Sequence, residues 1–204
     1  MVQLTCISTR GGDSGKTSLA DGRRLSKHSL RIEAIGAVDE VNSFIGIALS
    51  LIQDNRRASM QTMQQDILHK QNDLFDVGSD LCLPDQGQNA LRINETQVKR
   101  LDHLVQHYNS HLNPLNSFVL PGGTPLACQL HVCRSTTRRA ERTIVALHQD
   151  ETLNEYLLSY INRLSDVLFV MARVANNDGK EDVLWIPGHT QTNDAQTIEI
   201  QKKI

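Results

Sequence analysis

Residues 33–52 read EAIGAVDEVNSFIGIALSLI, and this stretch indicates the fold of the whole chain. After Glu33 its only charged side chains are Asp39 and Glu40, so a helix built from it is apolar on most of its sides. Such a helix is stable in water only when other elements cover it. The stretch therefore predicts a helix that lies inside a bundle.

Capping signals and apolar spacing predict four further helices. Asn94 followed three positions later by Gln97 forms a capping box, and Thr124 before Pro125 is an N-cap followed by proline at the first helical position. No internal repeat and no alternation of strands with helices is found, so we expect an all-α, up-and-down bundle of five helices with ferritin-like topology. The further predicted helices are 57–81, a third that starts after Asn94, 124–148 and 153–175.

The length and composition of the chain limit its class. A chain of 204 residues fits one domain, which we place at residues 1–190, followed by a flexible tail at 191–204. The net charge of -2 argues against a nucleic-acid partner. No secretory segment or long uncharged apolar run is found, and no CxxC pair occurs, so we expect a cytoplasmic protein with free thiols and no membrane partner. The cysteines are Cys6, Cys82, Cys128 and Cys133.

Residues 1–31 form a basic arm that lacks a helical period. We expect a glycine-containing loop here, with a short strand over residues 2–7. Between Thr9 and Arg31 the cations outnumber the carboxylates by four, which indicates an anionic ligand. Those cations are Arg10, Lys16, Arg23, Arg24, Lys27 and Arg31, and the carboxylates are Asp13 and Asp21.

The glycines of the arm resemble a phosphate-binding loop without matching one. The Walker A pattern needs four residues between its glycines, and only three separate Gly11 from Gly15. The ingredients for phosphate binding remain, because glycines let backbone N–H groups approach a phosphate while Lys16 and Thr17 supply charge and a hydroxyl. The alternative is a solvated basic arm with glycine hinges.

The predicted fourth helix carries a row of charged residues. Arg134, Arg138 and Glu141 recur at i, i+4 and i+7 and share one face, with Arg142 at its margin. Guanidinium groups bind phosphate oxygens in pairs, so this face could hold a polyphosphate, with Glu141 orienting an arginine. The alternative is an exposed face stabilised by ion pairs between neighbouring turns.

Two polar stripes interrupt the apolar helices, one around Asp39 and one that includes Asn162, Asp166 and Arg173. A carboxylate in such a helix needs a counter-charge, a ligand or a neighbouring subunit. Asp166 and Arg173, seven positions apart, could pair with each other. Asp39 has no basic residue at i±3 or i±4, so its partner must come from elsewhere.

A metal site in the protein itself is not expected. The histidines at positions 103, 107 and 111 point away from the apolar face of their helix, and no carboxylate or cysteine completes a ligand set. We interpret them as solvated surface, and Trp185 as a packing anchor.

Three groups of segments resemble one family, the PduO-type ATP:cob(I)alamin adenosyltransferases. Together with Trp185, these segments cover the chain in order from about residue 9 to 188. Gly11 and Lys16 depart from the commoner residues of the family pattern. The segments are TRGGDSGKTSL (9–19) with 26–27, 31–34 and 38–43, FVLPGGTP (118–125) with 130–134 and 138–142, and YINRLSDVLF (160–169).

The resemblance implies a homotrimer of five-helix bundles with active sites between subunits. There reduced cobalamin attacks the 5′ carbon of ATP, adenosylcobalamin forms and triphosphate leaves, with Mg²⁺ accompanying the nucleotide. A flavin-type reductase and an adenosylcobalamin-dependent enzyme are plausible partners. Because the corrinoid supplies the nucleophile, the protein needs no catalytic base.

The resemblance also assigns residues to the site. A phenylalanine matching Phe118 helps to exclude the lower axial ligand of the corrinoid, and an aspartate matching Asp39 pairs across the interface with an arginine matching Arg134. Arg138 and Lys27 would stabilise charge on the departing triphosphate. The residues that match ATP-binding positions are Thr9, Arg10, Gly11, Gly12, Thr17, Ser18, Lys27, Arg138, Arg139, Ala140, Glu141, Arg142 and Asn162.

A different class of protein would share some of these features. A helical bundle that senses ATP without chemistry needs only the basic arm and the arginine face. It leaves Phe118 and the interfacial stripes without a role. A purely structural bundle leaves the arm between Thr9 and Arg31 unexplained.

Overall fold

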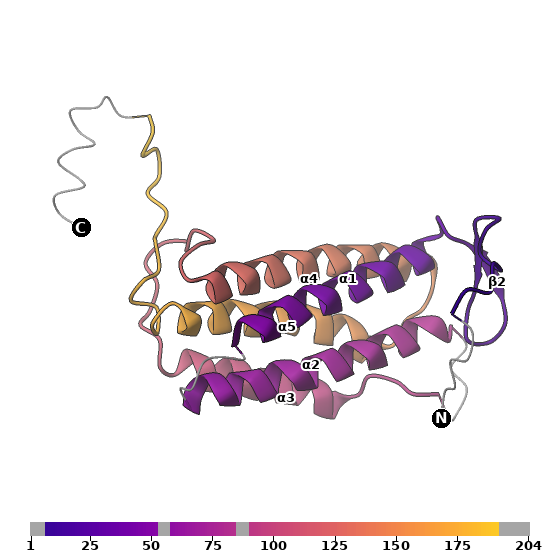
Figure 1. Ribbon diagram of the computed structural model, residues 1–204, viewed down its shortest axis with the longest axis horizontal. Helices are drawn as coiled ribbons and strands as arrows, with labels where there is room; N and C mark the ends of the chain where they lie inside the picture. The colour runs from indigo at the N-terminus through magenta and orange to yellow at the C-terminus, as the bar shows by residue number, and fades with distance from the viewer. Residues whose placement is uncertain (1–6, 53–57, 85–89, 192–204) are drawn as a thin grey trace.

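Five helices run side by side along the long axis of the molecule (Figure 1). The computed structural model describes residues 7–52, 58–84 and 90–191. All five predicted helices are confirmed, with ends within a few residues of those expected. They are α1 Leu30–Ile52, α2 Ala58–Cys82, α3 Glu95–Asn109, α4 Pro125–Asp150 and α5 Glu155–Ala175.

The predicted caps start α3 and α4. The Asn94 side chain accepts from the backbone N–H groups of Thr96 at 2.9 Å and Gln97 at 3.3 Å, and the Gln97 side chain accepts from the backbone N–H of Asn94 at 3.1 Å. The Thr124 hydroxyl accepts from the Ala127 N–H at 3.2 Å. These side chains satisfy N–H groups that the first helical turn leaves unpaired.

The helices pack in the order α2, α1, α4, α5, α3, so α1, α4 and α5 form the centre of the bundle. Tyr160, Ile45 and Leu130 come one from each of these helices and are among the large side chains that are fully buried in the core. At one end the buried guanidinium of Arg31 donates to the Leu81 carbonyl at 2.5 Å and to the Glu151 carboxylate at 2.6 Å. This contact joins the start of α1 to the ends of α2 and α4.

The basic arm is more ordered than the sequence predicted. Strands β1 Lys16–Ser18 and β2 Arg24–Ser26 form an antiparallel hairpin with Thr17 opposite Leu25. Gly22 in the turn has a φ of 85°, a conformation that glycine adopts without cost. The side chain of Leu19 is buried, and the Ala20 N–H donates to the Cys82 carbonyl at the end of α2 at 3.2 Å, which joins the hairpin to the bundle. The strand expected at 2–7 and the tail lie almost wholly outside the described residues.

By length and composition α1 could span a membrane. Its apolar face instead lies against α4 and α2, with Val41, Ile45 and Ala48 fully buried, as in the core helix of a bundle.

The predicted pairing of Asp166 with Arg173 is wrong. Arg173 donates to Asp182 at 2.7 Å, and Asp166 accepts from Arg163 at 2.8 Å. Each of the two residues therefore pairs with a residue other than the one seven positions away on its helix.

The histidines at positions 103, 107 and 111 are exposed, as expected. Within the described ranges no group of three or more His, Cys, Asp or Glu side chains could hold a metal ion. The cysteines at positions 82, 128 and 133 are free thiols, and Cys6 lies outside the described residues.

Candidate active site

The hairpin holds its glycine loop in a defined shape. Arg24 donates to the Gly11 carbonyl at 2.6 Å and to the Ser18 hydroxyl at 3.3 Å, and the Lys27 N–H donates to the Gly15 carbonyl at 2.9 Å. A Cβ atom on Gly12 would lie 3.0 Å from the Lys27 ammonium nitrogen, so the missing side chain lets this amine approach the backbone. The loop therefore presents glycine backbone and an ammonium group together.

Some cations of the arm form ion pairs within the protein, and others are exposed without a described ion-pair partner. Arg23 pairs with Asp21 at 2.6 Å, and Arg31 is committed to the bundle. Arg10, Lys16 and Lys27 are exposed and make no ion pair with any described residue. These three side chains are free to bind an anion.

The arginine face of α4, defined as Arg134, Arg138 and Arg142, has no acidic partner in the part of the chain that the structure describes. Burial and the neighbouring charge of Arg138 lower the pKa of Arg134. Like charges one helical turn apart destabilise a helix. Because no described ion pair neutralises these arginines, the alternative of an ion-paired surface does not hold here. An anion lying along this face would remove the repulsion.

Three further predicted residues, Arg139, Glu141 and Asn162, have partners within the chain. Arg139 forms an ion pair with Glu40 of α1, which is half-exposed. Glu141 accepts a hydrogen bond from the Asn162 amide of α5 at 2.8 Å rather than from an arginine, which differs from the orienting role expected for it. Ala140 is fully buried, and its side chain faces the core.

Phe118 lies on a different part of the molecule from the arm. Residues 117–120 pair with residues 183–185 through a Val119–Leu184 bridge and a hydrogen bond from the Trp185 N–H to the Phe118 carbonyl at 2.7 Å. The Phe118 ring is 77% exposed and lies 6.0 Å from the Trp185 ring. We call residues 117–120 and 183–185 the paired segments.

Trp185 differs from its interpretation as a packing anchor. It is 45% exposed beside Phe118, so it does not bury itself as a packing anchor would. Its position depends on pairing between segments more than 60 residues apart, and no local signal in the sequence indicates that pairing.

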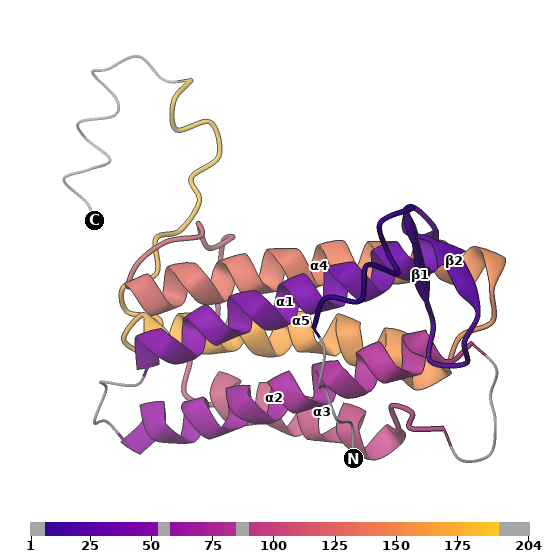
Figure 2. The same ribbon diagram turned by 45° about the vertical axis from the view of Figure 1, so that its right-hand side comes forward.

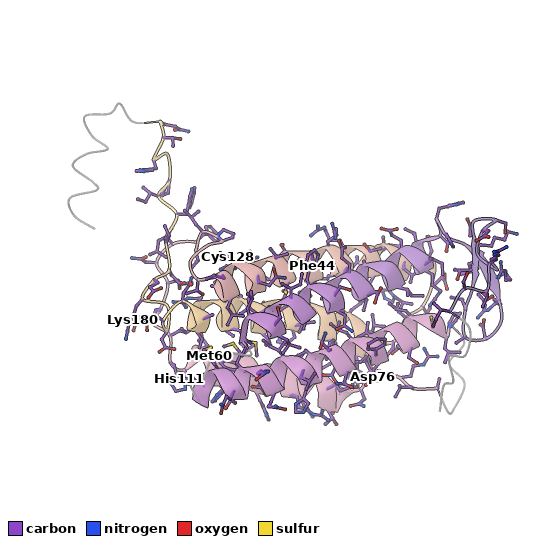
Figure 3. The ribbon with its side chains drawn as sticks, in the orientation of Figure 1. Phe44, Met60, Asp76, His111, Cys128 and Lys180 are labelled. Carbon is purple, nitrogen blue, oxygen red and sulfur yellow. The ribbon has the colours of Figure 1, made fainter. Side chains whose placement is uncertain are left out.

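The hairpin and the paired segments lie at opposite ends of the bundle. The hairpin is next to the start of α1, whereas the loop before α4 and the chain after α5 leave from the other end (Figures 1 and 2). Cys128 near the start of α4 and Lys180 mark that second end (Figure 3). The 26 residues of α4 span about 39 Å, so Lys27 and Phe118 of one chain do not meet.

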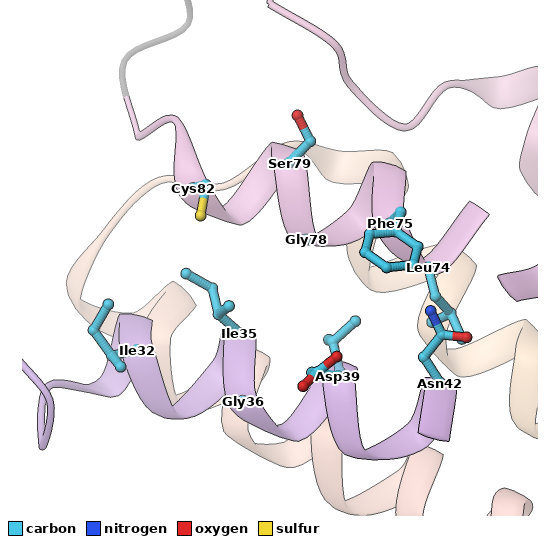
Figure 4. Close-up of a pocket in the computed structure, with 11 residues that line it drawn as sticks. Ile32, Ile35, Gly36, Asp39, Asn42, Leu74, Phe75, Gly78, Ser79 and Cys82 are labelled. Carbon is cyan, nitrogen blue, oxygen red and sulfur yellow. The ribbon is translucent and has the colours of Figure 1, made fainter. Parts of the chain in front are cut away.

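Asp39 lines a cleft of about 500 Å³ between α1 and α2, to which α1 contributes Ile35 and α2 contributes Phe75 and Cys82 (Figure 4). Its carboxylate is exposed and has no ion pair with any residue that the structure describes. Among the described residues of a single chain, then, neither Asp39 nor Arg134 has an ion-pair partner.

Comparisons with known proteins agree with this geometry. The family model described as Cobalamin adenosyltransferase matches residues 7–175. The chain is 49% identical to a cobalamin adenosyltransferase of Cupriavidus metallidurans, over 90% of this chain and 95% of that protein. It is 44% identical to a corrinoid adenosyltransferase of Mycobacterium leprae, over 92% of this chain and 98% of that protein.

A solved structure shares the fold as well. It is a phenylalanine-to-histidine variant of the PduO-type ATP:corrinoid adenosyltransferase from Lactobacillus reuteri, complexed with cobalamin and ATP. It matches with a TM-score of 0.82 and 36% identity over 89% of this chain and 97% of that one. The chain belongs to the cobalamin adenosyltransferase family.

Proposed function

We propose that the protein transfers the 5′-deoxyadenosyl group of ATP to the cobalt of a reduced corrinoid and releases triphosphate. The family match supports this activity. The observation that carries the site is the arginine face, whose guanidinium groups form no ion pair with any residue that the structure describes. Guanidinium forks bind phosphate oxygens in pairs. The Lys27 ammonium and the glycine backbone of the arm would surround the rest of the triphosphate.

The residues of this chain have three tasks in the reaction. Lys27 and Arg138 stabilise the negative charge that builds on triphosphate as the bond to the 5′ carbon breaks. The arm and Asn162 hold the nucleotide so that its 5′ carbon faces cobalt, which lowers the entropic cost of reaction. Phe118 and Trp185 form an apolar wall that keeps water and the lower axial ligand away from the corrinoid.

Mg²⁺ has no dedicated protein site in this proposal. The described residues contain no cluster of carboxylates or other ligands that fits a metal ion. Magnesium in nucleotide sites is commonly held by phosphate oxygens and water. We propose that it enters with ATP.

We propose a homotrimer with its active sites between subunits. The hairpin of the arm and the loop before α4, which carries Phe118, lie at opposite ends of one chain, so a second copy would have to bring one to the other. Asp39 and Arg134, each without a counter-charge, would pair across that interface. A flavin-type reductase, an adenosylcobalamin-dependent enzyme and a cytoplasmic location complete the proposal.

The first test is the reaction itself. With ATP, Mg²⁺ and cob(II)alamin under strong reduction, we expect the purified protein to form adenosylcobalamin, seen by absorbance, and one triphosphate for each Co–C bond. ATP binding measured by calorimetry, with no Co–C bond formed, would favour the ATP-sensing bundle instead.

Replacing Phe118 by alanine should separate the two substrates. We expect ATP binding to persist while the corrinoid step slows about tenfold or more, because desolvation effects of this kind are worth roughly 1–5 kcal/mol. Separate KM values for ATP and corrinoid provide the measurement. Leu91→Ala is the control, since Leu91 is also exposed but lies on the loop before α3. Equal losses for both substrates would count against the role of Phe118.

A further inference from the structure

A buried polar cluster joins the end of α5 to both paired segments. Arg173 donates through Nε to Asp182 Oδ2 at 2.7 Å and through Nη2 to the Asn113 carbonyl at 3.0 Å. Asn176 donates to Asp182 Oδ1 at 3.1 Å. The side chains of Arg173, Asn176 and Asp182 are all at least 95% buried. We call these three residues the Arg173 cluster.

The same cluster fixes the loop that carries Phe118. Asn176 donates to the Gly122 carbonyl at 3.1 Å and accepts from the Thr124 N–H at 3.0 Å. Gly123 has a φ of 99°, and a Cβ atom built there would lie 2.1 Å from Asn176 Oδ1. Only glycine allows this close approach. With Arg173 bound to the Asn113 carbonyl, the loop is held at both of its ends.

The cluster also fixes the second paired segment. Asp182 immediately precedes residues 183–185, and its carboxylate accepts from both Arg173 and Asn176. The Leu120 N–H then donates to the Val183 carbonyl at 2.8 Å, and the Ser117 hydroxyl donates to the Trp185 carbonyl at 2.6 Å. The Arg173 cluster therefore holds both of the paired segments, which carry the two aromatic rings.

The rings themselves contribute little to their own placement. Phe118 is 77% exposed and Trp185 is 45% exposed, so packing against the core does not fix either ring. Their backbone must then be held from elsewhere, and the hydrogen bonds of the Arg173 cluster supply that restraint. A buried network with every member paired holds one arrangement rigidly.

We propose that Arg173, Asn176 and Asp182 are positioning residues that set Phe118 and Trp185 at the corrinoid side of the site. The proposal rests on the proposed function, because it assigns the apolar wall to those two rings. The cluster does not touch either substrate. It acts through the backbone, so its loss should affect the corrinoid and leave ATP binding unchanged.

The deciding variant is Asp182→Asn, which keeps the size of the side chain and removes its charge. Its matched control is Asp102→Asn, because Asp102 also pairs with an arginine of α5, Arg163 at 2.5 Å, but is half-exposed and is not a member of the Arg173 cluster. Trp185 is the only tryptophan of the chain. Quenching of its emission by acrylamide therefore reports directly on the exposure of one of the two rings.

For Asp182→Asn we expect kcat/KM for the corrinoid to fall about tenfold or more, since a misplacement of about 1 Å can cost about a hundredfold in rate. KM for ATP should stay within about twofold, because displacement of the rings leaves the phosphate site unchanged. Trp185 should become easier to quench, because its backbone loses the restraint of the cluster. The control should match the unsubstituted protein in all three measurements. If Asp182→Asn does not fold, Arg173→Lys, which keeps the charge and loses the fork, is measured instead.

Two results would overturn the proposal. One is a folded variant whose corrinoid kinetics and Trp185 quenching are unchanged. The other is an equal loss for ATP and corrinoid, which indicates general destabilisation rather than positioning. Phe118→Ala separates this failure from that of the proposed function. If that variant leaves corrinoid kinetics unaltered, the wall assignment is wrong, and Trp185 quenching alone decides whether the cluster positions the rings.

Discussion

The Arg138→Ala variant is expected to lose about a hundredfold or more in kcat while keeping its fold, because losing one preorganised charge donor has an effect of this size. Arg138 is exposed in the middle of the arginine face and makes no ion pair with a described residue. An exposed arginine without a partner adds little to stability. The variant should therefore lose transition-state stabilisation and little else.

Three measurements establish this result. Steady-state kinetics give kcat and the KM for ATP, and thermal unfolding gives the stability of the fold. Arg138→Lys should fall between the alanine variant and the unsubstituted protein, since lysine keeps the charge but cannot bind two oxygens at once. Arg100→Ala removes an exposed arginine of α3 and should change none of these quantities. Kinetics of Arg138→Ala like those of the unsubstituted protein would remove Arg138 from the site.

The helices could be predicted because their signals are local. The Asn94 cap, the Thr124 cap and the apolar stretch 33–52 each depend on residues that are close together in the sequence. The hairpin was missed because strands of three residues are too short for a two-residue period to be recognised. Its order comes from the hydrogen bond of Arg24 to the Gly11 carbonyl and from that of the Ala20 N–H to the Cys82 carbonyl of α2. Only the folded chain provides these contacts.

The part of the site that depends on local spacing could be predicted, and the part that depends on contacts between distant segments could not. Helical spacing predicts the row Arg134, Arg138 and Glu141, with Arg142 at its margin. The structure adds that no described carboxylate forms an ion pair with the three arginines. The spacing argument failed for Arg173, whose partner Asp182 lies beyond the end of its helix. It also could not reveal that Trp185 lies beside Phe118, because the pairing of segments 117–120 and 183–185 depends on the folded bundle.

Replacement of Asp39 or of Arg134 is the second change that should have a large effect. The Asp39 carboxylate has no ion pair in the described part of one chain. Arg134 is half-buried, and its guanidinium donates only to His131 Nδ1, at 3.4 Å, among the partners that the structure describes. Burial lowers the pKa of His131, so at neutral pH its ring is uncharged and accepts this bond. An uncharged imidazole leaves the charge of Arg134 uncompensated.

A carboxylate from another copy of the chain would supply that charge. Asp39→Asn should then weaken activity and trimer assembly, because removing one member of a buried ion pair costs about 3–5 kcal/mol. Arg134→Ala should have a similar effect. Glu95→Gln is the control, since Glu95 forms only an exposed pair with Lys99.

The exchange of the two residues tests the contact itself. A protein carrying both Asp39→Arg and Arg134→Asp should recover part of what either change alone destroys, although the two side chains differ in shape and the rescue will be incomplete. Adenosylation rate and sedimentation together form a double-mutant cycle, and residues in contact show coupling of about 0.5–3 kcal/mol. Strictly additive losses would exclude the contact. So would a structure of the assembled protein in which Asp39 and Arg134 lie far apart in every pair of subunits, and Arg134 would then need another counter-charge.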